Sequence, residues 1–457
     1  MSSVSVVILA AGQGTRMKSD LAKVLHRVGG KSMILRSVDT ASRLADEPPV
    51  VVVGRDADAV RQSLGSRARY VTQAPLLGTG HAVMQTADVL RSQGGIVAVF
   101  HADLPLLRAE TLARLVEVQM SDPASVITLL SVIAPDPRGF GRLIRDRAGH
   151  ILANVEERDC TPEQRQIHEL NVGAYAFDAA WLWDNLSRLQ VKSNGEYYLT
   201  DLIHAASESG RIVNGVECED LDEVIGVNTR VHLSEAEAAL RRRLTRHWML
   251  EGVTILDPMT TYIQEDVTIG QDTLIYPNTH LMGKTAIGAN SIIGPNSILV
   301  DSRIGAFCTV EYSVVERAVL EDHVEIGPFS HLRTGAYLAE GVHMGNFGEV
   351  KNSRLGPKTR MGHFSYIGDA QVGEDVNIGA GTITANFDGE RKHQTVIGDH
   401  AFIGSDTILR APVTVEANAK TAAGSVVTHD VPSGYISIGV PGRLRELKPK
   451  EDTVDGA

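Results

Sequence analysis

The sequence predicts an α/β domain with a Rossmann-like, mostly parallel sheet, followed by a connecting helix and a parallel β-helix of hexapeptide repeats. Two observations lead to this prediction. In the N-terminal half short β-branched runs alternate with helical stretches, and in the C-terminal half aliphatic residues recur every six positions. Alternating strands and helices build a parallel sheet that is covered on both faces. A six-residue period fits neither a helix nor an alternating strand, but it is typical of a β-helix whose coils are each closed by three short strands.

The six-residue repeat extends over residues 267–427. Its aliphatic positions include Ile269, Ile275, Leu281, Ile287, Ile293, Leu299, Ile397, Ile403, Leu409 and Val415. We expect each of these side chains to point into the coil and to stack on its neighbours above and below. A glycine follows several of them, as at Gly270 and Gly288, and we attribute it to the backbone freedom that a turn needs. A β-sandwich, the alternative architecture, would not keep so strict a period.

The composition narrows the function classes. At 457 residues the chain is too long for one core, and its net charge of −12 offers no basic stripe for nucleic acid. Its three cysteines have no paired or metal-like spacing, which indicates a reducing compartment. There is no run of about 18 apolar residues to cross a bilayer, and the start of the chain lacks the basic region of a secretory signal. We therefore expect a cytoplasmic protein that binds neither nucleic acid nor a membrane.

In the N-terminal half, parallel strands are predicted at 4–10, 50–53, 96–100 and 125–131, with helices at 31–44 and 110–120. The first strand ends in a Gly-rich turn, residues 11–17, which is neither a P-loop nor a dinucleotide fingerprint. As a generic turn it would need no function. However, Arg16 and Lys23 place two cations just after exposed backbone N–H groups, which suits a triphosphate.

Asp103 follows the strand predicted at 96–100, and ligands of such sheets sit at the carboxyl ends of strands. A carboxylate there can hold Mg²⁺ against phosphate oxygens. The alternative is an aspartate that only caps a helix or forms a turn.

Several motifs of the N-terminal half, taken in order, resemble the signature of the sugar-nucleotide pyrophosphorylases. They are Leu9-Ala10-Ala11-Gly12-Gln13-Gly14-Thr15-Arg16-Met17 with Lys23, Gln73 with Leu77-Gly78-Thr79-Gly80-His81-Ala82, Gly139-Phe140-Gly141-Arg142, Glu156, Glu169-Leu170-Asn171-Val172-Gly173 and Gly226-Val227-Asn228. Joined to a hexapeptide β-helix, which is left-handed in that family, the chain resembles the bifunctional enzymes that combine N-acetylglucosamine-1-phosphate uridyltransferase with glucosamine-1-phosphate N-acetyltransferase. The resemblance extends from about Ser5 to Pro441.

The resemblance implies a Mg²⁺-dependent nucleotidyltransferase site that uses UTP. Asp103 and Asn228 would bind the metal, and Arg16 and Lys23 would hold the phosphates. The remaining residues implied for UTP and the sugar phosphate are Leu9, Ala10, Ala11 and Gly12 of the turn, Gln73, Gly78 and Thr79 for the uracil, and Gly141, Glu156 and Asn171 for the acetylated sugar. One difference from the family is His101-Ala102, where an aromatic residue and glycine are common, so a methyl group occupies the space before Asp103.

The resemblance also implies an acetyltransferase site in the β-helix, where a proton must leave an ammonium group and donors must stabilise an oxyanion. His363 stands where the family carries its base, and Glu349 is a candidate for orienting it, although a single histidine is more often structural. Glucosamine 1-phosphate would be bound by Arg333, Lys351, Tyr366, Asn377 and Lys392, and acetyl-CoA by Ala380, Asn386, Phe387, Ser405 and Ala423.

Three features near that site are specific to this sequence. Phe387 replaces the tyrosine usual in the family, and the segment 384–394 breaks the six-residue count, so a loop is expected to project there. An arginine that some relatives have near Gly439 is missing, and Arg443 or Arg445 is a hypothetical substitute.

The expected domains are 1–230 for uridyl transfer, a linker helix at 231–251, and 252–457 for acetyl transfer with a mobile tail from Gly442. Within the helical stretch 229–251, Ser234 and Glu237 fit a capping box. The family is a homotrimer through the β-helix, which the sequence permits. Two alternatives remain: a single-activity nucleotidyltransferase whose β-helix is structural or regulatory, and a scaffold without catalysis.

Overall fold

The computed structural model describes residues 3–137 and 139–446. Two compact units divide the chain between Leu240 and Arg241, inside helix α8 (Arg230–Leu250). Each unit is built around its own hydrophobic core. Over the residues described, no helix has both the length and the apolar character needed to span a bilayer.

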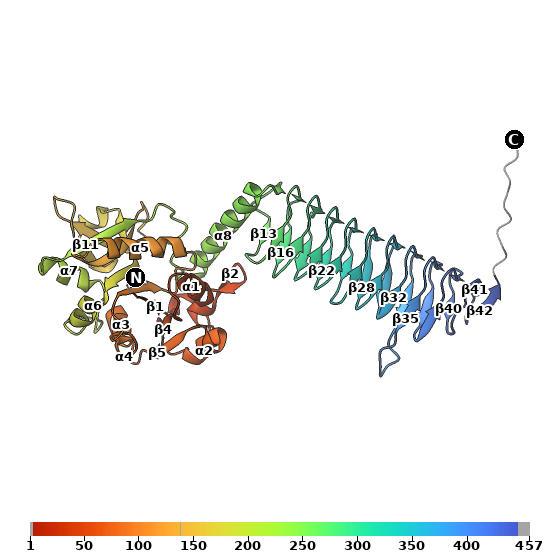
Figure 1. The fold of residues 1–457 in the computed structure, drawn as a ribbon, viewed down its shortest axis with the longest axis horizontal. Helices are drawn as coiled ribbons and strands as arrows, with labels where there is room; N and C mark the ends of the chain where they lie inside the picture. The colour runs from red at the N-terminus through yellow and green to blue at the C-terminus, as the bar shows by residue number, and fades with distance from the viewer. Residues whose placement is uncertain (1–2, 138, 447–457) are drawn as a thin grey trace. The chain divides into compact units, whose positions relative to one another are not determined.

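The N-terminal unit contains a nine-stranded mixed sheet whose main order is β11-β7-β10-β6-β1-β4-β5 (Figure 1). Neighbours on this path pair in parallel except β10, which runs antiparallel to both β6 and β7. The strands are β1 (Val4–Leu9), β4 (Val50–Val53), β5 (Arg69–Thr72), β6 (Ile96–His101), β7 (Ser125–Ile133), β8 (Gly141–Arg145), β9 (Ile151–Val155), β10 (Glu169–Asp178) and β11 (Ile212–Glu217), with a separate pair β2 (Arg27–Val28) and β3 (Lys31–Ser32). The mostly parallel α/β sheet predicted from the sequence is confirmed.

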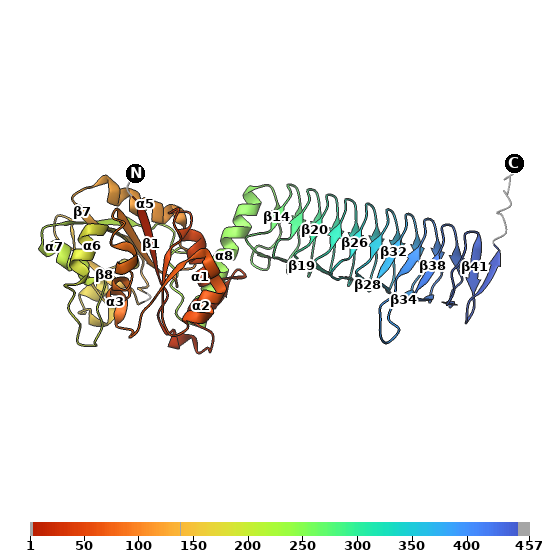
Figure 2. The ribbon, with the colours of Figure 1, turned by 60° about the horizontal axis from the view of Figure 1, so that its bottom comes forward.

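Helices cover both faces of this sheet, because successive side chains of a strand point to opposite sides. Val6 and Ile8 of β1 pack with α1, α2 and α5, whereas Val7 and Leu9 pack with α3, α4, α6 and α7. Figure 2 shows α1 and α2 on one side of β1 and α6 and α7 on the other. These helices are α1 (Met33–Ala41), α2 (Ala57–Leu64), α3 (Gly78–Met84), α4 (Ala87–Leu90), α5 (Ala109–Ser121), α6 (Ala179–Leu186) and α7 (Asp201–Glu208), and the 3-10 turns are η1 (Thr15–Met17), η2 (Lys23–Leu25), η3 (Gly65–Arg67), η4 (Glu157–Asp159) and η5 (Gln164–Gln166). Burial on both faces explains why these strands are almost wholly apolar.

Helix α8 starts four residues before the predicted capping box. The hydroxyl of Thr229 accepts a hydrogen bond from the His232 N–H at 3.2 Å, so Thr229 caps the helix and Ser234 lies inside it. The Glu237 carboxylate instead accepts a hydrogen bond from the Gly29 N–H at 2.9 Å. The capping-box prediction is therefore wrong: a tertiary contact uses the glutamate.

The second unit is a left-handed parallel β-helix with three long sheets (Figure 1). Its described strands form a 12-stranded sheet from β12 (Thr254–Ile255) to β42 (Arg443–Glu446), a 10-stranded sheet from β13 (Tyr262–Ile263) to β40 (Val426–Val427), and a nine-stranded sheet from β14 (Thr268–Ile269) to β38 (Val413–Val415). We call these sheets 1, 2 and 3. As far as β40, each strand pairs with the strand three positions before it, so each of these coils contributes one strand to every sheet.

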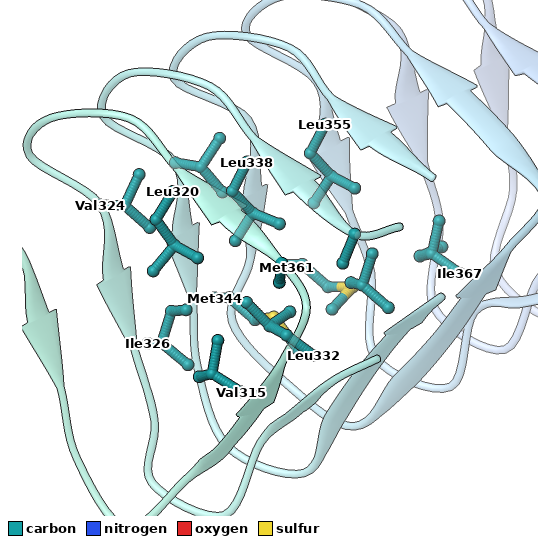
Figure 3. Packing of buried hydrophobic residues seen from close by; sticks show 14 of the residues in the cluster. Val315, Leu320, Val324, Ile326, Leu332, Leu338, Met344, Leu355, Met361 and Ile367 are labelled. Atoms are coloured by element: carbon teal, nitrogen blue, oxygen red, sulfur yellow. The ribbon is translucent and has the colours of Figure 1, made fainter. Parts of the chain in front are cut away.

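Aliphatic side chains from the three sheets meet inside the coils and stack from coil to coil (Figure 3). Leu332, Leu338 and Met344 represent one coil and are fully buried. Threonine and serine fill other inward positions, and their hydroxyls bond to the backbone, as when Thr273 Oγ1 donates to the Gly288 carbonyl at 3.0 Å. The inward role predicted for the aliphatic residue of each hexad is confirmed.

The repeat glycines have a different cause from the one expected. Gly270 and Gly288 do not adopt positive φ, but a Cβ on Gly270 would lie 2.4 Å from the backbone nitrogen of Ala289 in the next coil. The left-handed backbone conformation is adopted instead by nearby polar residues such as Asp272 (φ 60°) and Asn290 (φ 59°). Close stacking of coils, not turn freedom, therefore requires glycine.

The segment 386–394 projects from the coil between β34 (Ile383–Ala385) and β35 (Thr395–Ile397), as predicted (Figure 2). We call it the projecting hairpin, because Phe387 and Lys392 form an antiparallel bridge across it. At the C-terminal end, residues expected to be mobile form β42, which pairs antiparallel with β41 (Tyr435–Ile438). The open edge of sheet 1 supplies the backbone partners, and the tail beyond Glu446 lies outside the described residues.

Candidate functional site

The carboxyl ends of β1, β5 and β6 border a cavity of ≈ 510 Å³ in the N-terminal unit. Most of the predicted nucleotide residues line it: Leu9, Ala10, Ala11, Gly12, Arg16, Lys23, Gln73, Gly78, Thr79, Asp103 and Asn228. Gly78 has φ +91°, and a Cβ there would lie 2.6 Å from the Tyr197 carbonyl oxygen, so no larger residue fits. The side chain of Gln73 is buried and donates to the Gly78 carbonyl at 2.9 Å.

Lys23, Asp103 and Asn228 meet at one point of this cavity. The Lys23 ammonium donates to Asp103 Oδ2 at 2.5 Å and to Asn228 Oδ1 at 3.1 Å. The two residues expected to bind a metal thus direct their oxygens at one position although they lie far apart in the chain. In the part of the chain that the structure describes, no cluster of three or more histidine, cysteine or acidic side chains could hold a metal.

The oxygen pair fits Mg²⁺, which is usually held by one or two carboxylates together with water and substrate phosphates. Burial acts to raise the pKa of Asp103, but the adjacent Lys23 ammonium, together with hydrogen bonds from Lys23 and the backbone, outweighs it, and the pKa is lowered. The carboxylate therefore carries its charge at neutral pH. Burial also lowers the pKa of His101, which keeps this imidazole neutral beside the lysine.

The residues expected to bind the acetylated sugar form their own cluster and do not line that cavity. Asn171 of β10 lies opposite Gly141 of β8, and a Cβ on Gly141 would collide with the Asn154 side chain at 2.4 Å. Glu156 accepts hydrogen bonds from Asn154 and Thr200, and burial raises its pKa. The structure thus brings Gly141, Glu156 and Asn171 together.

His101 links this cluster to the cavity. It lines the cavity, and its ring lies 2.9 Å from the position that a Cβ on Gly173 of β10 would take. Ala102, whose methyl group the sequence placed near the ligand, is fully buried in the core instead. The methyl group therefore takes no space from a ligand, and the residue that does face the cavity is His101.

A second cavity, of ≈ 710 Å³, opens on sheet 1 of the β-helix, and we call it the groove. His363 is exposed and lines it, from the corner between β30 (Arg360–Met361) and β31 (Ser365–Gly368). Four further predicted residues line the groove: Asn377, Ala380, Ser405 and Ala423. Three of these have small side chains and occupy the same corner of successive coils, which leaves open space beside them.

The other predicted residues of this unit gather on sheet 2. They are Arg333, Lys351, Tyr366, Asn386, Phe387 and Lys392, which we call the sheet 2 cluster; none of them lines the groove. Arg333 donates to Glu349 at 2.9 Å, Asn386 donates to Asp369 at 2.5 Å, and Lys392 lies 3.9 Å from the same carboxylate.

Positive charge accumulates in the sheet 2 cluster. The positive charge of Lys392, which has the larger effect, and that of Arg333 lower the pKa of Lys351, because like charges disfavour its charged form. Such a cluster is suited to a phosphate. The partner of Glu349 is Arg333, so an orienting role of Glu349 toward His363 stays a prediction.

The structure also shows lining residues that the sequence did not single out. Glu196 lines the nucleotide cavity, and Arg360 and Lys420 line the groove. Glu196 lies in no recognisable motif. The sequence did contain a signal for the two cations. Arg360 directly precedes the inward Met361 and Lys420 directly precedes the inward Thr421, and the residue before an inward position faces outward.

The fold and the two cavities define a class of protein: an NTP transferase domain joined to a hexapeptide-repeat transferase domain. Residues 6–166 match the MobA-like NTP transferase domain family, and residues 266–300 and 394–429 match the bacterial transferase hexapeptide family of six repeats.

Proteins named "Bifunctional protein GlmU" resemble the chain over almost its whole length. The one from Heliobacterium modesticaldum is 46% identical over 96% of each chain, and that from Geobacillus thermodenitrificans is 46% identical over 98% of this chain and 97% of the relative. That from Streptococcus equi subsp. zooepidemicus is 45% identical over 95% and 94%. The chain belongs to the GlmU family.

Proposed function

We propose that the chain catalyses two successive transfers, one in each unit. The β-helix transfers acetyl from acetyl-CoA to glucosamine 1-phosphate. The N-terminal unit then transfers UMP from UTP to N-acetylglucosamine 1-phosphate, giving UDP-N-acetylglucosamine and pyrophosphate. The observation that carries the proposal is the meeting of Lys23, Asp103 and Asn228 at the Gly-rich turn, in a cavity separate from the groove that contains His363.

In uridyl transfer, a phosphate oxygen of the sugar phosphate attacks the α-phosphorus of UTP, and the bond to the β-phosphate oxygen breaks. Positioning and charge neutralisation supply most of the rate enhancement, so no covalent nucleophile is required. Arg16 and Lys23 neutralise the phosphates, while Gln73 and the backbone at Gly78 fix the base. The cluster around Asn171 and its neighbours orients the sugar.

Asp103 and Asn228 would hold Mg²⁺ through their side-chain oxygens. When bound, Mg²⁺ supplies positive charge against the phosphate oxygens. Lys23 touches both residues and so keeps their oxygens directed at one position.

In acetyl transfer, His363 accepts a proton as the amine of glucosamine 1-phosphate attacks the thioester carbonyl, and the C–S bond then breaks to release CoA. The small residues Ala380, Ser405 and Ala423 form one wall along which acetyl-CoA lies. The cations of the sheet 2 cluster hold the sugar phosphate. The word "bifunctional" in the relatives' names favours this scheme over a single activity.

The division of predicted residues between the groove and sheet 2 supports a shared site in a homotrimer. Asn386 and Phe387 of the projecting hairpin would complete the groove of a neighbouring copy. Exposed aromatic rings also form a column along one corner: the Tyr312 and Phe329 rings are tilted with centroids 5.6 Å apart, and the Phe329 and Phe347 rings stack with centroids 5.4 Å apart. Phe329 and Phe347 are 56% and 59% exposed, an apolar surface that a second copy would cover.

The three cysteines are free and buried, and we place the protein in the cytoplasm, where thiols stay reduced.

The proposal is tested by an assay that starts from glucosamine 1-phosphate, acetyl-CoA, UTP and Mg²⁺ and measures thiol and pyrophosphate release. Thiol release should require glucosamine 1-phosphate but not UTP. Pyrophosphate release should require either acetyl-CoA or added N-acetylglucosamine 1-phosphate. Absence of thiol release would leave a single-activity enzyme, and absence of both products would leave a scaffold.

A further inference from the structure

Outward side chains of sheet 1 form a continuous ladder along the floor of the groove. Each residue of the ladder is the registered neighbour of the next: His343, Arg360, Asn377, Phe402, Lys420 and Ile436. All of them line the groove. Any elongated ligand lying there must pass over these side chains in this order.

The ladder is basic although the chain is acidic overall. None of the described residues that line the groove is aspartate or glutamate. The side chain of Lys420 is exposed and has neither a hydrogen-bond nor an ion-pair partner among residues 3–137 and 139–446. A lysine with no structural contact, in a groove without carboxylates, is available to an anionic ligand.

The position of Lys420 relative to His363 determines which anion it can reach. Arg360 shares the coil of His363, whereas Lys420 lies three ladder steps further along. Neighbouring strands are about 4.8 Å apart, so three steps span roughly 14 Å. The pantetheine arm of acetyl-CoA is about as long as four extended residues, or roughly 13–14 Å. With the thioester at His363, the diphosphate of the cofactor falls at Lys420.

The residues between these two points suit the arm. Phe402 lies one step before Lys420 and is 47% exposed, so its ring can cover the apolar part of the arm. On the facing corner Ala380, Ser405 and Ala423 have no long side chains.

We propose that Lys420 binds the diphosphate of acetyl-CoA and thereby sets the distance between the nucleotide end of the cofactor and His363. The proposal rests on the acetyltransferase activity proposed above. Lys420 is a binding residue: it acts on the affinity for acetyl-CoA and not on the chemical step.

The test compares Lys420→Ala and Lys420→Arg with the unmodified protein, using acetyl-CoA and S-acetylpantetheine, which lacks the diphosphate and the nucleoside. Loss of one partly exposed charge-assisted contact should raise KM for acetyl-CoA by about five- to fifteenfold with little change in kcat. Lys420→Arg should restore most of the affinity. With S-acetylpantetheine the variants and the unmodified protein should behave alike. Raised salt should weaken acetyl-CoA binding more in the unmodified protein than in Lys420→Ala.

Lys284→Ala is the control, because Lys284 is an exposed lysine of the same unit that does not line the groove and does not adopt positive φ. An unchanged KM for acetyl-CoA in Lys420→Ala would overturn the proposal. So would an equal loss with S-acetylpantetheine, or a change of molar mass in solution, which would assign Lys420 to a subunit contact. If the unmodified protein released no thiol at all, the proposed acetyltransferase activity would itself have failed, a result distinct from any of these.

Discussion

Replacing Asp103 with asparagine removes one negative charge from the nucleotide cavity and changes little else. The side chain is 19% exposed and that of Lys23 is 12% exposed, so the contact between them is largely shielded from water. Asparagine keeps the shape and still accepts a hydrogen bond from the lysine, but it binds Mg²⁺ weakly. Loss of one charged group that stabilises a transition state in such a site costs about 3–4 kcal/mol, or two to three orders of magnitude in rate.

The assay measures pyrophosphate release from UTP and N-acetylglucosamine 1-phosphate over a range of Mg²⁺ concentrations. Thiol release from acetyl-CoA by the same sample serves as the control, because that site lies in the other unit. We expect uridyl transfer to fall about 10²–10³-fold and to need more Mg²⁺, with thiol release unchanged. Lys23→Met should not add its full effect to Asp103→Asn, since the two side chains are in contact.

One result would refute this reasoning, and a second would show that the variant is unsuitable. If Asp103→Asn retained uridyl transfer within about fivefold of the unmodified protein, the carboxylate would not support the transition state. If both activities fell together, the substitution would have damaged folding, and the measurement would say nothing for a site at Asp103.

Four further predictions follow from the structure. His363→Ala should lower thiol release by roughly two to four orders of magnitude and leave pyrophosphate release intact, as expected of a general base; comparable thiol release in the variant would exclude that role. Asp388→Ala should loosen the projecting hairpin and raise KM for acetyl transfer, because its carboxylate accepts the N–H groups of Glu390 and Arg391 at 2.8 and 2.7 Å; unchanged acetyl-transfer kinetics would show that the hairpin is dispensable. Leu338→Ala, in the β-helix core, should cost roughly 2–5 kcal/mol in denaturant unfolding, whereas the outward Ile292→Ala should cost far less, and equal losses would contradict the core assignment. Because the pKa of Asp103 is lower in the folded protein, its contribution to stability is present above its unfolded pKa of about 4 and is lost as the pH falls through the folded value, so unfolding midpoints of Asp103→Asn should depend less on pH in that range.

Local sequence patterns predicted the fold because the residue types in each segment reflect which of its side chains are buried. In the β-helix every inward position contacts only its own coil and the coils above and below, so a six-residue period in the sequence is sufficient to identify the architecture. In the N-terminal unit, strands buried on both faces are apolar throughout, which made β1, β4 and β6 recognisable. Asp103 could be placed at the carboxyl end of a strand, and Lys23 downstream of the Gly-rich turn that follows β1.

Predictions failed where a local pattern competed with a distant contact. Glu237 fits a capping box, but Gly29, more than 200 residues away, takes its carboxylate. Gly270 fits a turn, but the backbone of the next coil is what excludes a side chain there. Ala102 follows His101, which lines the cavity, yet the alternation of side chains turns its methyl group into the core.

The sequence by itself determined the two architectures and the chemical types gathered in each site. Only the tertiary structure decided that Asp103 and Asn228 meet at Lys23, and that His363 faces the groove while the sheet 2 cluster lies on another face. Which face an outward residue occupies depends on the coil position at which its strand begins, and the inserted hairpin shifts that count. Contacts of this kind join residues far apart in the chain, so no periodic pattern in the local sequence predicts them.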